Sequence, residues 1–489
     1  MSNPADAGDP YLSASQLAGL LRSGATTSVE LVDAVLQRIE AGNARLNAVV
    51  TVDADGARRA AIEADEARAS GRPVGPLHGL PITLKDSFAT AGLRTTAGKP
   101  DLADHVPDAD AVVVERLRAA GAIVVGKTNL PTGVSGQETA NEVHGRTRNP
   151  WDLDRTPGGS SGGAAAALAA GLTPLDIGSD SGGSIRQPAH CCGVYGHLAS
   201  HGLVPQRGHL PSVPLEDRGA LLDMFSIGPM ARHPDDLALV LPLLIGDDPL
   251  FASATRFHLP PPVLPAQGLR GVRVVVVADD AACPSNAEVR ARLEHTADLL
   301  DQAGAELVQC WPPFDVEAAM DVAFRLWVAA NATDDDGTGG TGDALSMARD
   351  EALHLSHAGW LELDTERRRL TRCWTDLFRR VDVALLPISP VPALPHDPDV
   401  AHLHEVGHRL ERHIDVDGTQ RPYLDQVMWN VLVGMGGLPA TAVPLGRTPG
   451  GLPVGGQIVG AQNMDRTTIA VASRLAEIAG GFAPPPGCP

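Results

Sequence analysis

Apolar positions in the N-terminal third of the chain show helical spacing first and strand-like runs later. Residues 13–70 have helical periodicity, and Thr27–Glu30 has the pattern of a capping box, which marks the start of a helix. From 79 to 127 short apolar runs alternate with helical segments, and the alanine-rich stretch 164–170 predicts a closely packed helix. This alternation predicts an α/β fold.

The same alternation continues in the C-terminal half. An apolar run at 272–277, an amphipathic segment at 288–303 and a second run starting at Glu306 predict a βαβ-like unit. Further elements are expected as buried strands at 383–386 and 455–459 and as a closing helix at 466–479.

The composition is that of an acidic protein. Its net charge of −20 argues against a nucleic-acid partner and against binding to anionic membranes. The apolar runs are too short to span a membrane, and the polar, acidic N-terminus is unlike a signal peptide. Six cysteines without a CxxC pair are typical of reduced thiols. We therefore expect a cytoplasmic protein without a membrane or nucleic-acid partner.

Two serines stand in separate glycine-rich turns. Ser160 lies in GGSSGG, and Ser184 lies 24 residues later in SGGSIR. Glycine lets the backbone adopt positive φ and approach a ligand closely, so each turn can present a hydroxyl beside free N–H donors. A hydroxyl and N–H donors are two parts of an acyl-transfer site, and the third part is a base.

Lys85 is the candidate base. Lysine occurs only three times among 39 basic residues, so arginine supplies nearly all the positive surface charge. Lysine, unlike arginine, can lose its proton. The apolar run before Lys85 predicts a strand that leads inward, and burial would lower the pKa of the amine until it can accept a proton. A strand-end lysine paired with Asp86 is the alternative, which the two serine turns make less favoured.

These residues belong to longer motifs that follow one another along the chain. The motifs are GLPITLKD, GAIVVGKTNLP, ETANEVHG, RNPWDLDRTPGGSSGG and GSDSGGSIRQPAHCCGVYG. With them the chain resembles the amidase signature family of serine hydrolases over most of its length. The resemblance implies an α/β fold in which a mixed, twisted central sheet is covered by helices on both faces.

The resemblance also favours a single domain over 1–489. Within it we expect N-terminal helices at 1–70, a signature core at 75–200 and a variable region at 311–430. The proline-rich stretch 259–265 could mark a boundary, but the motifs on both sides fit one fold.

The resemblance assigns catalytic roles by position. It makes Ser184 the nucleophile, Ser160 a bridging serine in a cis peptide after Gly159, and Lys85 the base, so that protons pass from Ser184 through Ser160 to Lys85. An ordinary buried ion pair and loop packing are the alternatives for the supporting and substrate-lining residues. The remaining roles are oxyanion donors (Ser181, Gly182, Gly183 and Ser184), substrate-lining residues (Gly133, Val134 and Ser135) and loop supports (Asp180 and Arg186).

Section 311–430 is the least determined part of the sequence. In a resembling enzyme it would wall the pocket and select the substrate; the alternative is a helical layer beneath a solvated loop. The acidic, glycine-rich run 333–343 predicts a mobile loop, and the sequence does not decide whether it acts as a lid. Five of the six tryptophans lie in this section, namely Trp311, Trp327, Trp360, Trp374 and Trp429.

Two other motifs point to different functions. Residues 121–128 fit the P-loop pattern GxxxxGK[ST], but the β-branched run Ile123–Val125 occupies the loop, so we expect a strand with Lys127 at its end. His404–His408 has the HExxH pattern of zinc hydrolases, but Gly407 weakens a helix and the longer zinc-binding context is missing. We therefore expect no metal site.

The sequence thus predicts an amidohydrolase that cleaves carbon–nitrogen bonds of linear, non-peptide amides, with aryl amides, carbamates (urethanes) and esters as further candidates. The alternatives are a partner-dependent subunit of a tRNA-dependent amidotransferase and a silent binding protein, against which the intact Lys85, Ser160 and Ser184 argue. No cofactor is implied, because the relay supplies both base and nucleophile. The resemblance also implies a homodimer, for which the residues give no independent support.

Overall fold

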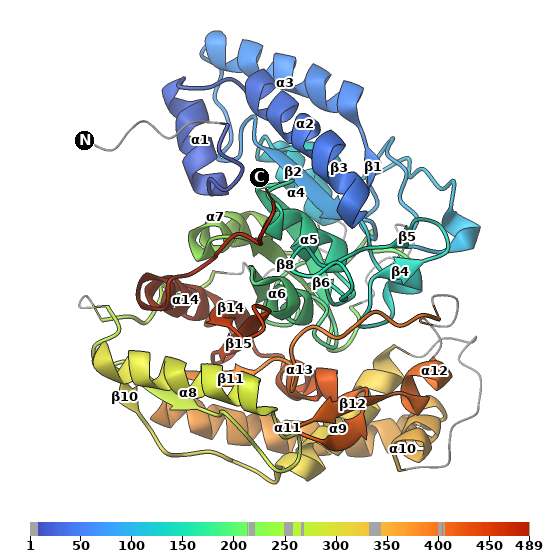
Figure 1. Ribbon diagram of the computed structural model, residues 1–489, viewed down its shortest axis with the longest axis vertical. Coiled ribbons are helices and arrows are strands. Elements are labelled where there is room, and N and C mark those ends of the chain that lie inside the picture. The colour runs from blue at the N-terminus through green and yellow to red at the C-terminus, as the bar shows by residue number, and fades with distance from the viewer. Residues whose placement is uncertain are drawn as a thin grey trace.

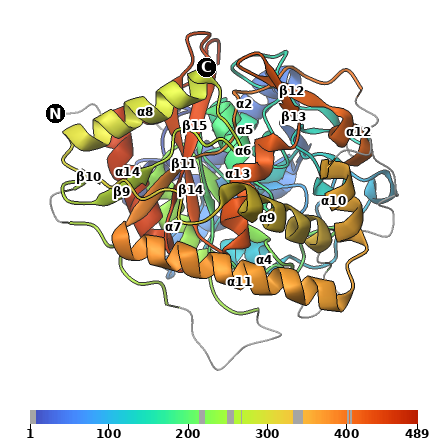
Figure 2. The same cartoon turned by 90° about the horizontal axis from the view of Figure 1, so that it is seen from below.

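A computed structural model describes residues 8–212, 214, 221–248, 258–265, 268–331, 344–399, 403 and 406–488. Within these residues one 11-stranded sheet forms the centre of the molecule (Figures 1 and 2). Its strands, in spatial order, are β1 (Val49–Val52), β3 (Ile123–Thr128), β2 (Pro81–Lys85), β6 (Leu175–Asp180), β8 (Ser226–Ala231), β7 (Tyr195–Leu198), β14 (Ala440–Arg447), β15 (Pro453–Val459), β11 (Val383–Pro387), β9 (Arg273–Val276) and β10 (Glu306–Leu307).

The sheet is mixed. β2 runs parallel to both of its neighbours, β3 and β6, and β9 runs parallel to β10 and β11. The strands between these two parallel groups pair antiparallel, from β6–β8 across to β15–β11. Because this one sheet joins strands from residue 49 to residue 459, it supports our proposal that the chain forms a single domain.

Helices cover both faces of the sheet. Side chains alternate between faces along a strand, so the adjacent residues Met230 and Ala231 of β8 point to opposite sides. Met230 packs with the alanine-rich helices, and Ala231 packs in the largest core cluster. The helices are α1 (Ala14–Ser23), α2 (Ser28–Leu46), α3 (Ala54–Ala69), α4 (Val112–Ala119), α5 (Gly162–Ala169), α6 (Arg186–Cys192), α7 (Pro234–Leu244), α8 (Ala287–Gln302), α9 (Val316–Ala330), α10 (Ala344–Leu353), α11 (His357–Arg380), α12 (Val406–Glu411), α13 (Asp425–Met435) and α14 (Asp465–Ala479).

Most of the expected elements are present. Thr27 caps α2, and its side chain and that of Glu30 form the capping box that the sequence predicts. β9, α8 and the short parallel strand β10 form the expected βαβ unit. The α/β prediction, with a mixed sheet between helical layers, is therefore confirmed.

One expectation for the N-terminal segment was wrong. Residues 13–70 are not all helical, because Val49–Val52 forms β1, an edge strand paired antiparallel with β3. Three of its four residues are valine, and the fourth is threonine, so the run suits a strand. Because we assigned helical spacing to the whole of 13–70, the prediction overlooked this four-residue strand.

The remaining elements are short. No helix in the described ranges combines the length and the apolar character needed to cross a membrane. The run 333–343, which the sequence predicts as a mobile loop, lies outside the described residues. The short elements are β4 (Ala140–Asn141), β5 (Gly145–Arg146), β12 (His413–Val416), β13 (Thr419–Pro422) and the 3₁₀ turns η1 (Pro100–Leu102) and η2 (Thr132–Val134).

Candidate active site

The topology brings the candidate catalytic residues to one edge of the sheet. Lys85 is the last residue of β2, and Asp180 is the last residue of β6. These strands are parallel neighbours, with Leu84 opposite Ile177, so their C-terminal ends lie at the same edge. The loop 181–185, which carries Ser184, therefore starts beside Lys85.

Lys85 is fully buried and hydrogen-bonded to serine hydroxyls. Its Nζ lies 2.7 Å from Oγ of Ser160 and 2.9 Å from Oγ of Ser179. Burial lowers the pKa of Lys85 to about 7, although Asp180 and Asp176 act in the opposite direction. Near neutral pH a large fraction of this amine is therefore unprotonated and able to accept a proton.

Asp86 does not pair with Lys85. One oxygen of the buried Asp86 carboxylate accepts hydrogen bonds from the N–H and hydroxyl groups of Thr96, and it lies 3.5 Å from Nε2 of His144. The alternative of a strand-end Lys85–Asp86 ion pair is therefore wrong, because the two side chains have separate partners.

The two serine turns are joined through the backbone. The Gly159–Ser160 peptide bond is cis, and the N–H of Ser161 donates to the carbonyl oxygen of Ser184 at 3.0 Å. Ser160 is fully buried, whereas Ser184 is partly exposed. Ser184 is therefore accessible from solvent, whereas Ser160 and Lys85 are not.

The loop that carries Ser184 is held by a buried ion pair. Arg186 donates to both carboxylate oxygens of Asp180, each at 2.9 Å, and both side chains are inaccessible to solvent. Burial alone would raise the pKa of Asp180, but the Arg186 guanidinium and the hydrogen bonds from the N–H groups of Gly183 and Ile185 together keep this pKa below its usual value. The Asp180 carboxylate thus stays ionised in its buried position, where the charge of Arg186 compensates it.

One of the expected oxyanion donors is occupied. The N–H of Gly183 donates to Oδ1 of Asp180 at 2.7 Å, because the Asp180 side chain folds back over the loop. The assignment of Gly183 as an oxyanion donor is therefore corrected. The N–H groups of Ser181, Gly182 and Ser184 donate to no acceptor in the described residues, which leaves these three as candidate donors.

The expected substrate-lining loop lies beside the Ser160 turn. A Cβ atom on Gly159 would lie 2.4 Å from the carbonyl oxygen of Gly136, which places the end of this loop against the turn. Gly133 and Val134 both have positive φ, and with Ser135 they are partly exposed. Their position is compatible with contact to a substrate.

The sequence did not identify the residues of section 311–430 that contact the Ser184 loop. The ring of Trp327, on α9, packs against Gly182, and its Nε1–H donates to Oγ of Ser181 at 3.1 Å. Asn331 also donates to Oγ of Ser181, at 3.0 Å. Five tryptophans in this section were the available signal, but nothing in their spacing singled out Trp327.

The other tryptophans of this section serve mainly as core. Trp374 and Trp429 are fully buried, and Trp311 lies between them with ring centroids 5.8 and 6.2 Å away. The section therefore combines both interpretations that the sequence left open, since α9 contacts the Ser184 loop through Trp327, α13 contacts it through Asn430, and the buried tryptophans form a packed layer.

The P-loop-like motif forms a strand, and the described part of the HExxH motif lies beside a carboxylate. Ile123–Thr128 forms β3, so no phosphate loop is present there, and Lys127 is a buried residue whose amine donates to Thr90 and Thr95. His404 and Glu405 lie outside the described residues, and Nε2 of His408 lies 3.0 Å from a carboxylate oxygen of Asp397. No cluster of metal-ligating side chains occurs among the residues that are described.

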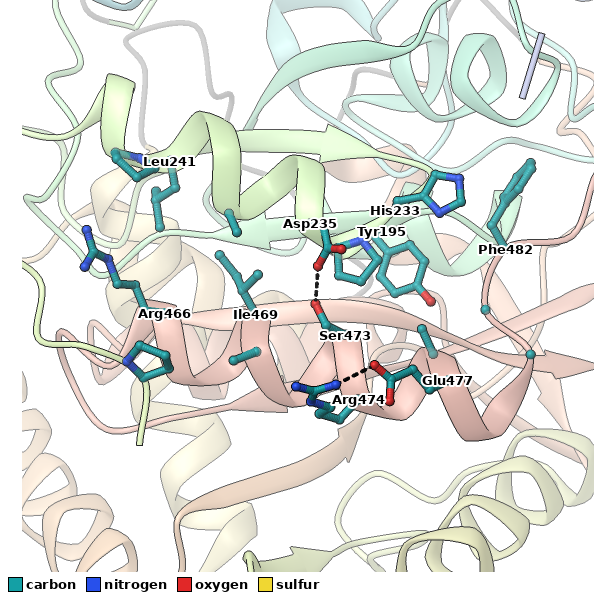
Figure 3. A pocket seen from close by; sticks show the side chains of 18 residues that line it. Tyr195, His233, Asp235, Leu241, Arg466, Ile469, Ser473, Arg474, Glu477 and Phe482 are labelled. Atoms are coloured by element: carbon teal, nitrogen blue, oxygen red, sulfur yellow. Dashed lines mark hydrogen bonds and ion pairs between the residues drawn. The ribbon is translucent and has the colours of Figure 1, made fainter. Parts of the chain in front are cut away.

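A separate cavity of about 750 Å³ lies between α7 and α14 (Figure 3). Its polar wall includes Asp235 and Ser473, whose hydroxyl donates to the Asp235 carboxylate at 2.8 Å. The residues that line it include neither Lys85 nor the two serines. The cavity is therefore distinct from the Ser184 loop.

Known proteins resemble this chain over almost its whole length. A family model described as Amidase matches residues 30–469. A glutamyl-tRNA(Gln) amidotransferase subunit from Salinispora tropica is 34% identical, over 97% of this chain and 98% of that protein.

Among solved structures, a bacterial aryl acylamidase of the amidase signature family has a TM-score of 0.80 at 27% identity, covering 96% of each chain. A 6-aminohexanoate cyclic dimer hydrolase with bound substrate has a TM-score of 0.78 at 27% identity, covering 98% of this chain and 99% of that one.

Proposed function

This chain belongs to the amidase signature family, and on that premise we propose that it hydrolyses amides through an acyl-enzyme on Ser184. The observation that carries the proposal is the 2.7 Å hydrogen bond between Nζ of Lys85 and Oγ of Ser160, both fully buried. Family membership implies an enzyme that acts on carbon–nitrogen bonds. Hydrolysis by this chain alone is our further step.

In the proposed mechanism neutral Lys85 takes the hydroxyl proton of Ser160, and Ser160 takes that of Ser184. The Ser184 oxygen then attacks the substrate carbonyl, and the N–H groups of Ser181, Gly182 and Ser184 hold the oxyanion. As the carbon–nitrogen bond breaks, the proton returns through Ser160 to the leaving amine. Water, activated by the same relay, releases the acid and regenerates Ser184.

We propose uncharged amides of small to medium size as substrates, including aryl amides and carbamates. The support is the Trp327 indole, which packs on the Ser184 loop beside the Asn331 amide, so this side of the loop offers an aromatic ring and a neutral polar group. The resemblance in fold to an aryl acylamidase is consistent with this class.

A second candidate is the amidotransferase role, which the 34% identity to the Salinispora tropica protein favours. There the ammonia released from an amide donor is transferred to another substrate rather than lost, and the description of that relative as one subunit of an enzyme indicates partner proteins. Both candidates need the same acyl-enzyme chemistry. They differ in whether the isolated chain turns over simple amides.

The test begins with a fluorophosphonate that reacts with activated serines, followed by peptide mass mapping of the wild type, Ser184→Ala and Lys85→Ala. We expect an adduct on Ser184 that is absent from both variants. The purified wild-type chain is then incubated separately with an anilide, a carbamate and glutamine, and the released amine or ammonia is measured.

Release of the aromatic amine by the wild type, but not by Ser184→Ala, supports the hydrolase. Labelling of Ser184 without turnover of any substrate, together with glutaminase activity that appears only with partner subunits, favours the amidotransferase. Full hydrolytic activity of Ser184→Ala contradicts both proposals.

A further inference from the structure

A line of buried polar side chains continues behind Lys85, away from Ser160. Oγ of Ser179 lies 2.9 Å from Nζ of Lys85 and 2.8 Å from Nε2 of His209. Lys85 and His209 are fully buried, and Ser179 is 1% exposed. The four side chains Ser160, Lys85, Ser179 and His209 thus form one continuous hydrogen-bonded chain.

The His209 ring is fixed in this position. It packs edge-to-face between Phe88 and Phe225, with ring centroids 5.2 and 4.7 Å away. Backbone hydrogen bonds on both sides of it, from Ala89 to Gly208 and from Leu210 to Ser87, attach its loop to the segment that follows Lys85. These contacts place the His209 ring beside Ser179, and through it close to the Lys85 amine.

The His209 imidazole is neutral. Burial holds its pKa well below the usual value, and the nearby Lys85 lowers it further. A neutral imidazole has one N–H and one acceptor nitrogen, so Nε2 either donates to Ser179 or accepts its hydroxyl hydrogen. Nδ1 is buried and makes no hydrogen bond of ordinary geometry, so it does not decide between the two tautomers.

The two tautomers have opposite consequences for Lys85. If Nε2 donates, the hydroxyl hydrogen of Ser179 is directed at the lone pair of the neutral Lys85 amine, where it competes with Ser160. If Nε2 accepts, Ser179 presents only lone pairs to Lys85, and the amine lone pair remains free for the Ser160 proton. The second arrangement also suits the ammonium form of Lys85. Its N–H groups can donate to Oγ of Ser160, to Oγ of Ser179 and to the more distant carbonyl oxygen of Ser179 at 3.5 Å.

We propose that His209 is a positioning residue that accepts the hydroxyl hydrogen of Ser179 and so directs the lone pair of Lys85 at Ser160. The inference rests on the proposed function, in which Lys85 is the base, and it adds a residue that orients this base. The titratable groups that also face Lys85 are Asp180 and Asp176 of β6, the second of which has its own pKa raised to about 7 by burial, and the substitutions below change neither residue.

The test uses His209→Phe, which keeps an aromatic ring between Phe88 and Phe225 but removes the acceptor. Without this acceptor, the Ser179 hydroxyl donates its hydrogen to neutral Lys85. It is then less well oriented to accept a hydrogen bond from the ammonium form of Lys85. We expect the pKa of Lys85 to fall by about one unit, the size expected of one hydrogen bond to a charged group. The matched control is His209→Gln, whose amide oxygen can replace Nε2 as acceptor and is expected to restore the pKa.

The pKa is measured by NMR on protein labelled with ¹³C at lysine, since the chain has only three lysines and Lys85 is assigned by its loss in Lys85→Met. Unchanged signals of Lys99 and Lys127 report an intact fold. With an active wild type, kcat/KM for an amide is expected to fall about 10- to 100-fold in His209→Phe and to recover in part in His209→Gln.

An unchanged Lys85 pKa in a folded His209→Phe protein overturns the inference. If that variant does not fold, Ser179→Ala and Ser179→Thr replace it. Ser179→Ala removes the hydroxyl and is expected to shift the Lys85 pKa. Ser179→Thr keeps the hydroxyl and is expected to leave that pKa unchanged. Equal pKa values in these two variants overturn the inference as well. Because the NMR titration needs no turnover, a wild type without amidase activity refutes the proposed function separately.

Discussion

Substituting Gly182 by alanine tests whether Trp327 holds the Ser184 loop, residues 181–185. A Cβ atom at residue 182 would lie 2.8 Å from both Cε2 and Nε1 of the Trp327 indole. Carbon atoms in contact normally lie about 3.5–4.0 Å apart, so the ring or the loop must move by about 0.7–1.2 Å. Gly182 has no positive φ, so the backbone itself accepts alanine and the effect comes from the contact.

The size of the effect follows from what must move. The indole is held by its hydrogen bond to Ser181, so displacement of the ring also disturbs the loop. Overpacking typically lowers the free energy of unfolding by about 1–3 kcal/mol. Loss of one oxyanion donor lowers kcat by about 10²- to 10³-fold, and because the donor acts on the transition state, we expect kcat to fall about 10²-fold with little change in KM.

The assay is steady-state hydrolysis of an anilide by Gly182→Ala, Trp327→Ala and the double variant. Removing the ring relieves the clash, so the double variant should be more active than the product of the single effects predicts, by a coupling energy above about 1 kcal/mol. Gly19→Ala is the matched control, because its Cβ meets nothing closer than 3.8 Å. Wild-type kcat in Gly182→Ala, or strictly additive effects, would refute the reasoning.

Three further predictions follow from the same geometry. Because the pKa of Lys85 is lowered to about 7 and the neutral amine is the active form, kcat/KM for an amide should rise with pH through about 7 and level off above it; a profile flat from pH 5 to 8 contradicts this. Lys85→Met should lower kcat about 10²- to 10⁴-fold and abolish fluorophosphonate labelling while leaving the melting temperature nearly unchanged. Arg186→Met leaves a buried Asp180 carboxylate without its partner and should lower the free energy of unfolding by about 3–5 kcal/mol in urea titrations, whereas the exposed Arg379→Met should change it little.

Local sequence patterns predicted the parts of the fold that depend on neighbouring residues. The capping box at Thr27, the βαβ unit from β9 to β10 and the strand nature of Ile123–Thr128 each follow from side chains a few positions apart. The contact between Lys85 and Ser160 joins residues 75 positions apart, and it was expected because whole motifs around both residues resembled one family.

The parts that were missed depend on long-range packing. Trp327 contacts Ser181, which lies 146 positions away in the sequence. His209 is linked to Lys85 through Ser179, a residue that no sequence pattern singles out. The N–H of Gly183 was assigned to the oxyanion because the sequence shows a glycine turn but not the direction in which the Asp180 side chain folds. Such contacts are set by the packing of elements, so no spacing along the chain reveals them.

In the mechanism that we propose, hydrolysis and amide transfer begin with the same acyl-enzyme, so the Lys85–Ser160–Ser184 arrangement would be common to both and would not distinguish them. The difference must lie in what the surroundings admit to Ser184 and where the released amine goes. Near the Ser184 loop those surroundings include the ring of Trp327 on α9, the amide of Asn331 after it and the side chain of Asn430 on α13. An exchange of Trp327 for a smaller side chain should therefore alter the preference among anilides, carbamates and glutamine more than it alters labelling of Ser184. If labelling and all three activities fall in equal proportion, α9 only supports the loop, and the choice of substrate is made elsewhere.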